Sequence, residues 1–442
     1  MQNNVSKDEI QSHPYAWPLL FLFTLSYTFS FVDRQVINLL VEPIKADLDL
    51  TDIQISYLQG LMFVIPYVAL SIPIGRLVDA VSRISVIIYG ILVWSIATMA
   101  AGLSGNFGQL AAARSFVGAG EAALTPAVWS VFPDIFGKDR LGLAMSIFSM
   151  APYLGAGLAL IAGAQIIEVS RTAEAISLPM FGELKPWQIT LIICGAPGLL
   201  LALIFAFVKE PKRRQVTPAD TETMPIGEVL DFMKQHWKVY LAFLGGAPFL
   251  IVMLYSLQAW TPTLLIRVHG WDILDAGRIY GTLSLVSGCL GTLSSPLVAK
   301  VMQRQNVQGY PIVTLIGCTA LTALFLFIAG QQNDGASSLI FIGLAGYFCT
   351  VPLPQLAVAM QTISPNKMRG VVAGLYVVTG NTMGLGFGPT AVAFLTEKVF
   401  ADPMAVGVSM GVTGLVAAPI AILIYLNGYK EYRELSSQAQ AA

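Results

Sequence analysis

The sequence has little charge for its length of 442 residues. Only 12% of the residues are Asp, Glu, Lys or Arg, whereas a soluble globular protein carries about 25%. Hydrophobic residues make up 55%, and the mean hydropathy is +0.69. So few charged side chains cannot cover the surface of a soluble fold of this size, which excludes a soluble enzyme and a disordered protein. The composition predicts a polytopic membrane protein.

Cysteine and excess charge of either sign are also scarce. Cys194, Cys289, Cys318 and Cys349 each lie alone in an apolar run, without CxxC spacing. They therefore predict small buried side chains rather than metal ligands or a disulfide framework. We expect no metal and no cofactor. The net charge of −1 argues against a nucleic-acid partner.

The sequence contains many long apolar runs. A bilayer core about 30 Å thick needs about 20 apolar residues per helix, and twelve stretches qualify. The stretches are 15–40, 54–78, 84–103, 108–132, 140–167, 187–208, 239–266, 276–301, 310–329, 337–362, 369–395 and 404–427. The first is too long for a cleaved signal peptide, so we expect it to be retained. The second opens with Thr51-x-x-Gln54, which predicts a capping box.

The longest polar stretch divides these spans into six and six. We expect an N-terminal six-helix half at 1–208, a cytoplasmic linker at 209–236, and a C-terminal six-helix half with a cytoplasmic tail at 237–442. The predicted fold class is an all-α membrane protein with twelve transmembrane helices. Apolar residues at helical spacing predict an amphipathic helix in the linker, along the inner membrane surface or against the protein's own inner face. These residues are Ile226, Val229, Leu230, Met233 and Trp237.

The distribution of Lys and Arg predicts the orientation. If the N-terminus is cytoplasmic, 17 basic residues fall in inner segments and 6 in outer segments. Basic residues concentrate on the cytoplasmic side of membrane proteins. We therefore expect a multi-pass protein of the cell inner membrane, in contact with the lipid bilayer and with both termini cytoplasmic.

A weak repeat relates the two predicted halves at an offset of 229 residues. The matching residues are Arg140, Ala144, Gly155 and Gly157 in the first half and Arg369, Ala373, Gly384 and Gly386 in the second. Two repeated six-helix halves are the architecture of secondary transporters of the major facilitator type, with the substrate site between the halves. We expect a monomer that alternates access, with Arg140 and Arg369 gating at the inner loops.

Charged residues inside a membrane span are expensive and point to function. Four qualify: Asp33 and Arg34 in the first span, and Arg114 and Glu121 in the fourth. Arg114 and Glu121 are seven residues apart, so they share a helix face. We predict that these residues couple transport to protons; the acids titrate, because arginine does not give up its proton in proteins. A purely structural salt-bridge cluster is the alternative.

Neutral polar side chains complete the predicted substrate site beside Arg34 and Glu121. The first span carries a polar stripe, and the second half offers only neutral groups well inside its spans. The remaining candidates for substrate binding are Tyr27, Ser30, Asn38, Gln258, Trp260 and Asn381. A cavity charged on one wall and apolar on the other fits an amphiphilic anion better than a sugar.

The loop after the second span resembles the major facilitator signature G-x-L-x-D-R-x-G-R. Gly75, Leu77, Asp79 and Arg83 match, whereas Ala80 and Ser82 depart. The resemblance implies that Gly75, Asp79 and Arg83 take part in gating, with Asp79 latching the inner gate at a helix terminus. The two departures imply a weakened latch.

Three further motifs resemble the Spinster family of lysophospholipid and sphingosine-1-phosphate transporters and their bacterial relatives. They are Asp33-Arg34, Arg114…Gly118-x-Gly120-Glu121 and Ser146-Ile-Phe…Gly155-x-Gly157. The resemblance covers most of the first half and is weaker in the second. It implies that Asp33 and Glu121 are protonation sites and that Arg34 holds the head group or couples it. The same charges also resemble proton-driven organic-anion symporters of the sialin type, the alternative function.

An intramembrane enzyme and a channel are the competing classes. Ser104 lies in a G-x-S-G motif and Ser409 in a G-x-S-x-G motif, and both would need a base to activate the serine. His13, His236 and His269 all lie in termini or loops. We therefore predict no enzyme and no catalytic residue. A single charge cluster in twelve spans suits alternating access better than an open pore.

Overall fold

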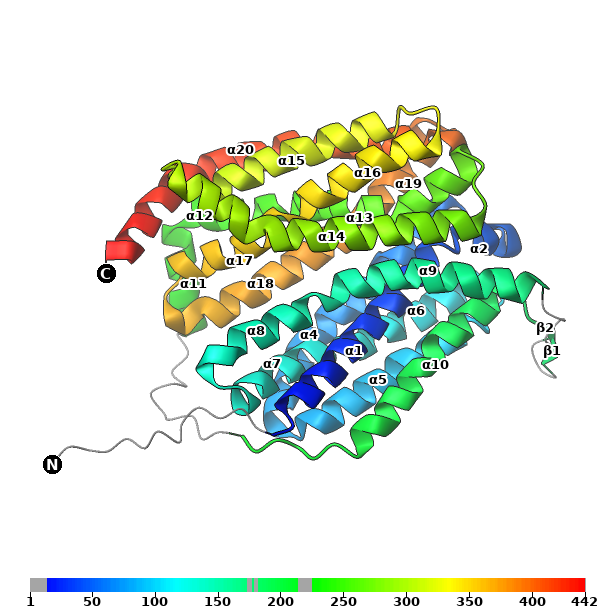
Figure 1. The fold of residues 1–442 in the computed structure, drawn as a ribbon, viewed down its shortest axis with the longest axis horizontal. Coiled ribbons are helices and arrows are strands. Elements are labelled where there is room, and N and C mark those ends of the chain that lie inside the picture. Colours follow the sequence, from blue (N-terminus) through cyan, green and yellow to red (C-terminus); the bar gives the residue numbers. More distant parts are fainter. Residues whose placement is uncertain (1–13, 173–176, 179–181, 214–224, 442) are drawn as a thin grey trace. The chain divides into compact units, whose positions relative to one another are not determined.

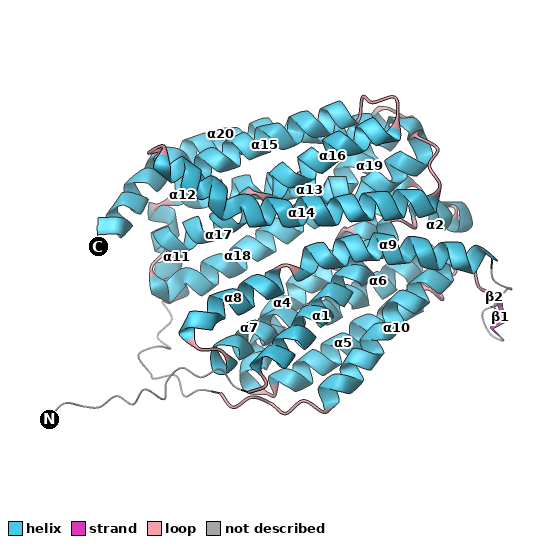
Figure 2. Cartoon of the chain, in the orientation of Figure 1, coloured by secondary structure: helices cyan, strands magenta, loops and turns pink. Residues whose placement is uncertain are grey.

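The computed structural model describes the chain except residues 1–13, 173–176, 179–181, 214–224 and 442. The described residues are almost entirely helical, which confirms the predicted fold class (Figures 1 and 2). Eleven of the described helices or helix runs are long and apolar enough to cross a membrane. One short antiparallel pair stands apart, formed by β1 (Ser177–Leu178) and β2 (Gly182–Glu183).

The chain divides into two compact units. The first comprises residues 1–37 and 65–215, and the second comprises residues 38–64 and 216–442. The sequence-based division instead places the whole of 1–208 in one half. The difference lies in residues 38–64, which pack with the C-terminal helices through contacts described below.

The first unit is built from the helices of the first six predicted spans. Its elements are α1 (Ala16–Gln35), α4 (Leu61–Ala80, from Ile65 on), α5 (Arg83–Ala101), α6 (Phe107–Glu121), α7 (Leu124–Ile135), α8 (Lys138–Ser149), α9 (Ala151–Thr172) and α10 (Pro186–Ala206). A 3-10 turn, η2 (Val36–Asn38), follows α1 and leads into the second unit.

The fourth predicted span, 108–132, is two helices rather than one. A turn at Ala122–Ala123 separates α6 from α7, and neither helix is among the eleven that qualify as spans alone. Pro126 explains the break, because it has no N–H to donate to the Ala122 carbonyl and its ring crowds that carbonyl. The break places Glu121 at the last position of α6.

The second unit contains the C-terminal helices together with the segment 38–64. Thr51 Oγ1 accepts from Gln54 N at 3.2 Å and Gln54 Oε1 accepts from Thr51 N at 3.0 Å, so the predicted capping box is present. The elements are α2 (Val41–Leu48), α3 (Asp52–Gln59), α11 (Ile226–Gln235), α12 (Trp237–Leu241), η4 (Ala242–Gly246), α13 (Ala247–Thr263), η5 (Leu264–Val268), α14 (Ile273–Arg304), α15 (Tyr310–Ala329), α16 (Gly335–Thr350), α17 (Pro352–Ile363), η6 (Asn366–Met368), α18 (Arg369–Asn381), η7 (Thr382–Phe387), α19 (Gly388–Phe394), η8 (Leu395–Val399), η9 (Pro403–Ala405) and α20 (Val406–Ala441). Four of these, η4, η5, η7 and η8, are π-helical turns.

The predicted amphipathic helix of the linker is α11. Val229 is buried, whereas Leu230 is exposed. Phe232 contacts the rings of His236 and Tyr240, which ties the helix to its own unit through the start of the seventh predicted span. The earlier part of the linker, 214–224, lies outside the described residues.

Candidate functional site

The interior of the first unit holds an ion pair between α1 and α6. Arg34 Nη2 lies 2.5 Å from Glu121 Oε2, and the two side chains are only 5% and 1% exposed. Ser30, one helical turn before Arg34, donates from Oγ to the same oxygen at 3.2 Å. The structure therefore brings together three residues that the sequence predicted on two separate spans. Glu121 Oε1 has no hydrogen-bond partner among the described residues.

Two aromatic rings lie close to the guanidinium of Arg34. Its Cζ lies 4.3 Å from the ring centre of Phe31 and 5.6 Å from that of Tyr67, which belongs to α4. Such cation–π contacts hold a charged group in an apolar setting without adding negative charge. Tyr27 stacks on Phe148 with ring centres 4.7 Å apart, so its ring extends this aromatic cluster. The sequence analysis missed Tyr67, since a tyrosine in an apolar run gives no separate signal.

Arg114 binds the end of α1. Its Nη1 donates to Asp33 O at 3.0 Å and its Nη2 donates to Arg34 O at 3.3 Å. The last carbonyls of a helix lack intrahelical partners and carry partial negative charge, so a guanidinium is favourable there. Arg114 therefore joins α6 to the end of α1, through backbone carbonyls rather than through a carboxylate. Its role in proton coupling stays a prediction.

Asp33 is the second buried acid of this site. The residue is 2% exposed, and its Oδ1 has no hydrogen-bond partner among the described residues. A buried carboxylate is costly unless it is paired or protonated. Its predicted role as a protonation site stays a prediction.

Glycines bring α5 and α6 close together beside this site. A Cβ on Gly120 would lie 2.6 Å from Trp94 N, and a Cβ on Gly90 would lie 2.9 Å from Gly120 O. Any larger side chain at either position would push the two backbones apart. Gly90 and Gly120 therefore allow the two helices to approach closely, and this packing fixes the position of the adjacent Glu121.

Three predicted substrate residues of the second unit each make a different hydrogen bond. Trp260 is fully buried and its Nε1 donates to Pro389 O at 2.9 Å, so it packs α13 against α19. Substrate binding by Trp260 stays a prediction. Asn38 Oδ1 accepts from Gln59 Nε2 at 3.1 Å, and Asn381 Nδ2 donates to Val377 O at 3.0 Å.

Gln258 is half-buried on α13. For Gln258, Asn38 and Asn381, as for Tyr27 in the first unit, substrate binding stays a prediction.

A second ionic cluster holds the N-terminus of α5. The side chain of Arg83 is 1% exposed and forms an ion pair with Asp134 of α7. Its Nε donates to Glu210 Oε1 at 2.8 Å, and its Nη2 donates to Pro211 O at 2.7 Å. The predicted gating residue Arg83 thus joins α5, α7 and the segment that follows α10.

Glu210 caps the same helix terminus. Its Oε2 accepts from Ser82 Oγ at 2.8 Å and from Ile84 N at 2.9 Å, where a carboxylate meets unpaired amides and positive partial charge. Burial alone would raise the pKa of Glu210, but the hydrogen bonds from Arg83, Ile84 and Ser82 outweigh it and hold the pKa below its usual value. The sequence analysis missed Asp134 and Glu210. Their only signals were an acid after Pro133 at the end of a span and a lone acid in the basic run 209–214.

Gating by Arg83 stays a prediction, and the remaining predicted gating residues are Gly75, Asp79, Arg140 and Arg369. A Cβ on Gly75 would meet nothing within 4 Å, so no close contact requires glycine there. Asp79 lies in α4, but its side chain is outside the described part of the structure. Arg140 is exposed, and Arg369 is exposed and donates from Nε to Ser364 O at 3.2 Å. Gating by these four residues stays a prediction.

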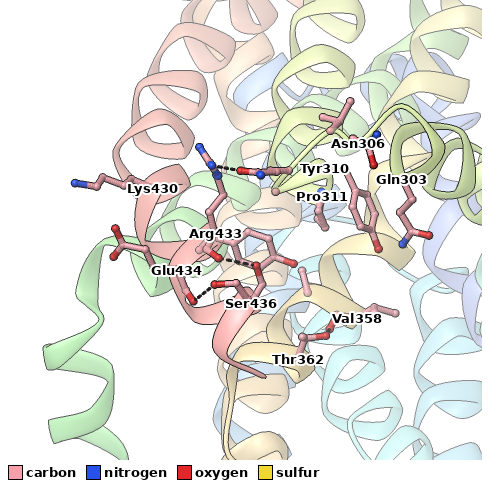
Figure 3. Close-up of a pocket in the computed structure, with 16 residues that line it drawn as sticks. Gln303, Asn306, Tyr310, Pro311, Val358, Thr362, Lys430, Arg433, Glu434 and Ser436 are labelled. Atoms are coloured by element: carbon pink, nitrogen blue, oxygen red, sulfur yellow. Dashed lines mark hydrogen bonds between the residues drawn. The ribbon is translucent and has the colours of Figure 1, made fainter. Parts of the chain in front are cut away.

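The second unit also has a cavity of about 880 Å³, at the ends of α14 and α20 and the start of α15. Figure 3 shows Lys430 and Glu434 directed away from its centre. Arg433 Nη2 donates a hydrogen bond to Gln308 Oε1. The cavity contains none of the predicted site residues.

An almost entirely helical membrane fold with an ion pair buried between two of its helices is typical of secondary transporters. The family model described as Major Facilitator Superfamily matches residues 23–389, and the chain belongs to this family of membrane transporters.

Its relatives include transporters of two kinds. The chain is 24% identical over 409 residues to an MFS-type efflux pump of Mycolicibacterium smegmatis (strain ATCC 700084 / mc(2)155), covering 91% of this chain and 90% of the pump. It is 23% identical over 390 residues to protein spinster homolog 1 of Xenopus tropicalis, covering 84% and 71%. The fold matches the crystal structure of a bacterial homolog to the human lysosomal transporter Spinster, with a TM-score of 0.78, 21% identity, and coverage of 98% and 99%. The predicted resemblance to Spinster proteins is thereby confirmed.

Proposed function

We propose that this protein is a proton-coupled secondary active transporter that moves an amphiphilic anion, such as a lysophospholipid, by alternating access. The observation that carries the proposal is the buried Arg34–Glu121 pair. Removing two charges from water costs several kcal/mol each, as an order of magnitude, and the attraction between them often fails to offset this cost. Such a pair is therefore poor as a purely stabilising device, which favours a functional role.

The proposed proton step occurs at Glu121. The proton goes to Oε1, the oxygen without a partner among the described residues, while Oε2 keeps its contact with Arg34. Protonation removes the negative charge that balances the guanidinium. Because arginine keeps its own proton, Arg34 then favours a phosphate or carboxylate, which it binds through charge-assisted hydrogen bonds. Proton and anion therefore favour each other's binding, as symport requires.

The surroundings of Arg34 support an amphiphilic substrate. Phe31, Tyr67 and the stacked Tyr27–Phe148 pair offer apolar surface close to the guanidinium. An acyl chain would lie against such rings while the head group binds Arg34. The similarity to an MFS-type efflux pump supports the transport function itself. We propose a monomer in the inner membrane with both termini cytoplasmic.

The test is flux in vesicles that contain the purified full chain. We expect a pH gradient to accelerate the movement of fluorescent lysophosphatidylglycerol, and the Arg34→Ala variant to lose this flux. Arg171→Ala is the matched control, because Arg171 is about half exposed and pairs only weakly with Glu168 at 3.7 Å. Flux of glucuronate in place of the lysolipid would assign the organic-anion function instead. Equal lysolipid flux with and without the gradient would contradict proton coupling.

A further inference from the structure

Arg267 fastens residues 38–64 to the C-terminal helices. It lies in η5, at the end of the seventh predicted span. Its Nη1 donates to Asp52 Oδ2 at 2.8 Å and its Nη2 donates to Asp52 Oδ1 at 2.9 Å, while Nε donates to Glu42 Oε1 at 2.9 Å. The side chains of Arg267 and Asp52 are 9% and 5% exposed. A bidentate arginine–carboxylate ion pair is among the stronger polar contacts in proteins.

Glu397 makes a second contact at the same helix end. Its Oε2 accepts from Ile53 N at 3.1 Å. Ile53 is the second residue of α3, where unpaired amides and the helix dipole favour a carboxylate. The N-terminus of α3 is thus held from two elements of the C-terminal part, η5 and η8.

The contact continues along α3 toward α4. One turn beyond Asp52, Ser56 Oγ donates to Thr390 Oγ1 at 3.3 Å. One turn further, Gln59 Nε2 donates to Ala259 O at 3.2 Å. A Cβ on Gly60 would lie 2.0 Å from Leu385 O, so the two backbones touch there. Both turns of α3 and the glycine that follows it are therefore closed against the C-terminal helices.

Asp52 has a second cation, Lys45, which contacts its Oδ1. Lys45 lies in α2, on the same segment as Asp52, and would stay with it if the segment moved away from Arg267. Two cations that share one carboxylate repel each other. The positive charge of Lys45 therefore weakens the attraction between Arg267 and this segment, and it leaves Asp52 a partner after separation.

We propose that Arg267, Asp52, Glu42 and Glu397 form a clasp that closes the transporter on its predicted outer side, and that Lys45 sets how readily the clasp opens. This inference rests on the proposed alternating access. Arg267 is a positioning residue, since it acts on the conformation rather than on the substrate. The two cations, Arg267 and Lys45, have opposite effects on the stability of the closed clasp. Neutralising Arg267 removes attraction across the clasp, whereas neutralising Lys45 removes repulsion across it.

The test measures the exposure of a cysteine at Ser56, which is fully buried while the clasp is closed. The full chain carries Ser56→Cys together with Cys289→Ser, because the other three native cysteines are buried. A membrane-impermeant maleimide is added outside right-side-out vesicles. We expect Arg267→Gln to speed labelling at least about tenfold, as for loss of one member of a mostly buried pair. We expect Lys45→Gln to slow it about twofold to threefold, the size of a partly exposed pair.

Controls separate opening from unfolding and from loss of transport. Arg278→Gln, an exposed arginine near the start of α14, should leave the rate unchanged. An unfolded variant would also label Cys194, Cys318 and Cys349, giving more than one label per chain. If Arg267→Gln unfolds the protein, two other variants test the clasp. Glu42→Gln should speed labelling and Lys45→Gln should slow it.

Two results would overturn the clasp. Either Arg267→Gln leaves labelling unchanged in folded protein, or Lys45→Gln shifts it in the same direction as Arg267→Gln. The measurement needs neither substrate nor a pH gradient. If Arg267→Gln speeds labelling and Lys45→Gln slows it, the clasp proposal would therefore stand even if the lysolipid assay failed. Conversely, pH-driven flux together with unchanged labelling would refute the clasp but not the proposed function.

Discussion

Replacing Glu121 by glutamine tests the coupling mechanism most directly. The amide is nearly isosteric with the carboxyl group, so its oxygen can still accept from Arg34 and Ser30, as Oε2 does now at 2.5 and 3.2 Å. The change removes the negative charge and the site for the proton. We expect Glu121→Gln to abolish the dependence of transport on the pH gradient while the protein still folds.

The expected effect on stability follows from the burial of the pair. The side chains of Arg34 and Glu121 are 5% and 1% exposed, so water cannot compensate the guanidinium for the lost negative charge without a local rearrangement. Breaking a buried pair by removing one partner costs about 3–5 kcal/mol. The amide NH2 would lie where Oε1 now has no partner among the described residues, which adds about 1–3 kcal/mol unless it finds an acceptor. Thermal unfolding in detergent should therefore show a clearly lower midpoint.

The assay compares wild type, Glu121→Gln and Glu168→Gln in the same vesicles, with and without a pH gradient. Glu168 is a matched control, because it is 40% exposed and its partner Arg171 is 3.7 Å away. We expect the control to keep both its melting midpoint and its response to the gradient. If Glu121→Gln were still driven by protons at the normal rate, the mechanism would be wrong. The pair would then have only a structural role.

Three further predictions concern gating and packing. Glu210→Gln should destabilise the protein by about 1–2 kcal/mol at neutral pH, the size of a charged hydrogen bond. Because the pKa of Glu210 is lowered in the folded state, the difference from wild type should shrink as the pH falls below about 4.3. Unfolding curves that stay equally far apart at all pH values would contradict this. Gly60→Ala should cost about 1–3 kcal/mol through overpacking against Leu385 O, whereas Gly75→Ala, with nothing within 4 Å, should be nearly neutral in the same melting assay. Asp79→Asn should bias the protein toward the inward-open state by about 0.3–1 kcal/mol if the helix-terminus role is correct; unchanged accessibility of a cysteine in the inner cavity would count against it.

The sequence by itself determined the features that depend on local composition and spacing. Apolar runs long enough for a bilayer predicted the helices, since the backbone must satisfy its own hydrogen bonds inside a membrane. The Thr51-x-x-Gln54 pattern placed the start of α3, because a capping box involves residues only three apart. The rarity of charge in the spans pointed to Arg34 and Glu121, which the structure brings into contact.

The tertiary structure decided the features that depend on contacts between distant segments. The partners of Arg83 are 51 and 127 residues away, so no local pattern could single out Asp134 or Glu210. The sequence shows that Trp260 lies in a span, but its hydrogen bond to Pro389 O depends on the packing of α13 against α19. The grouping of residues 38–64 with the C-terminal helices depends on Arg267, 215 residues beyond Asp52. Sequence spacing gives the face on which a side chain lies, whereas its partner is set by which helices pack together.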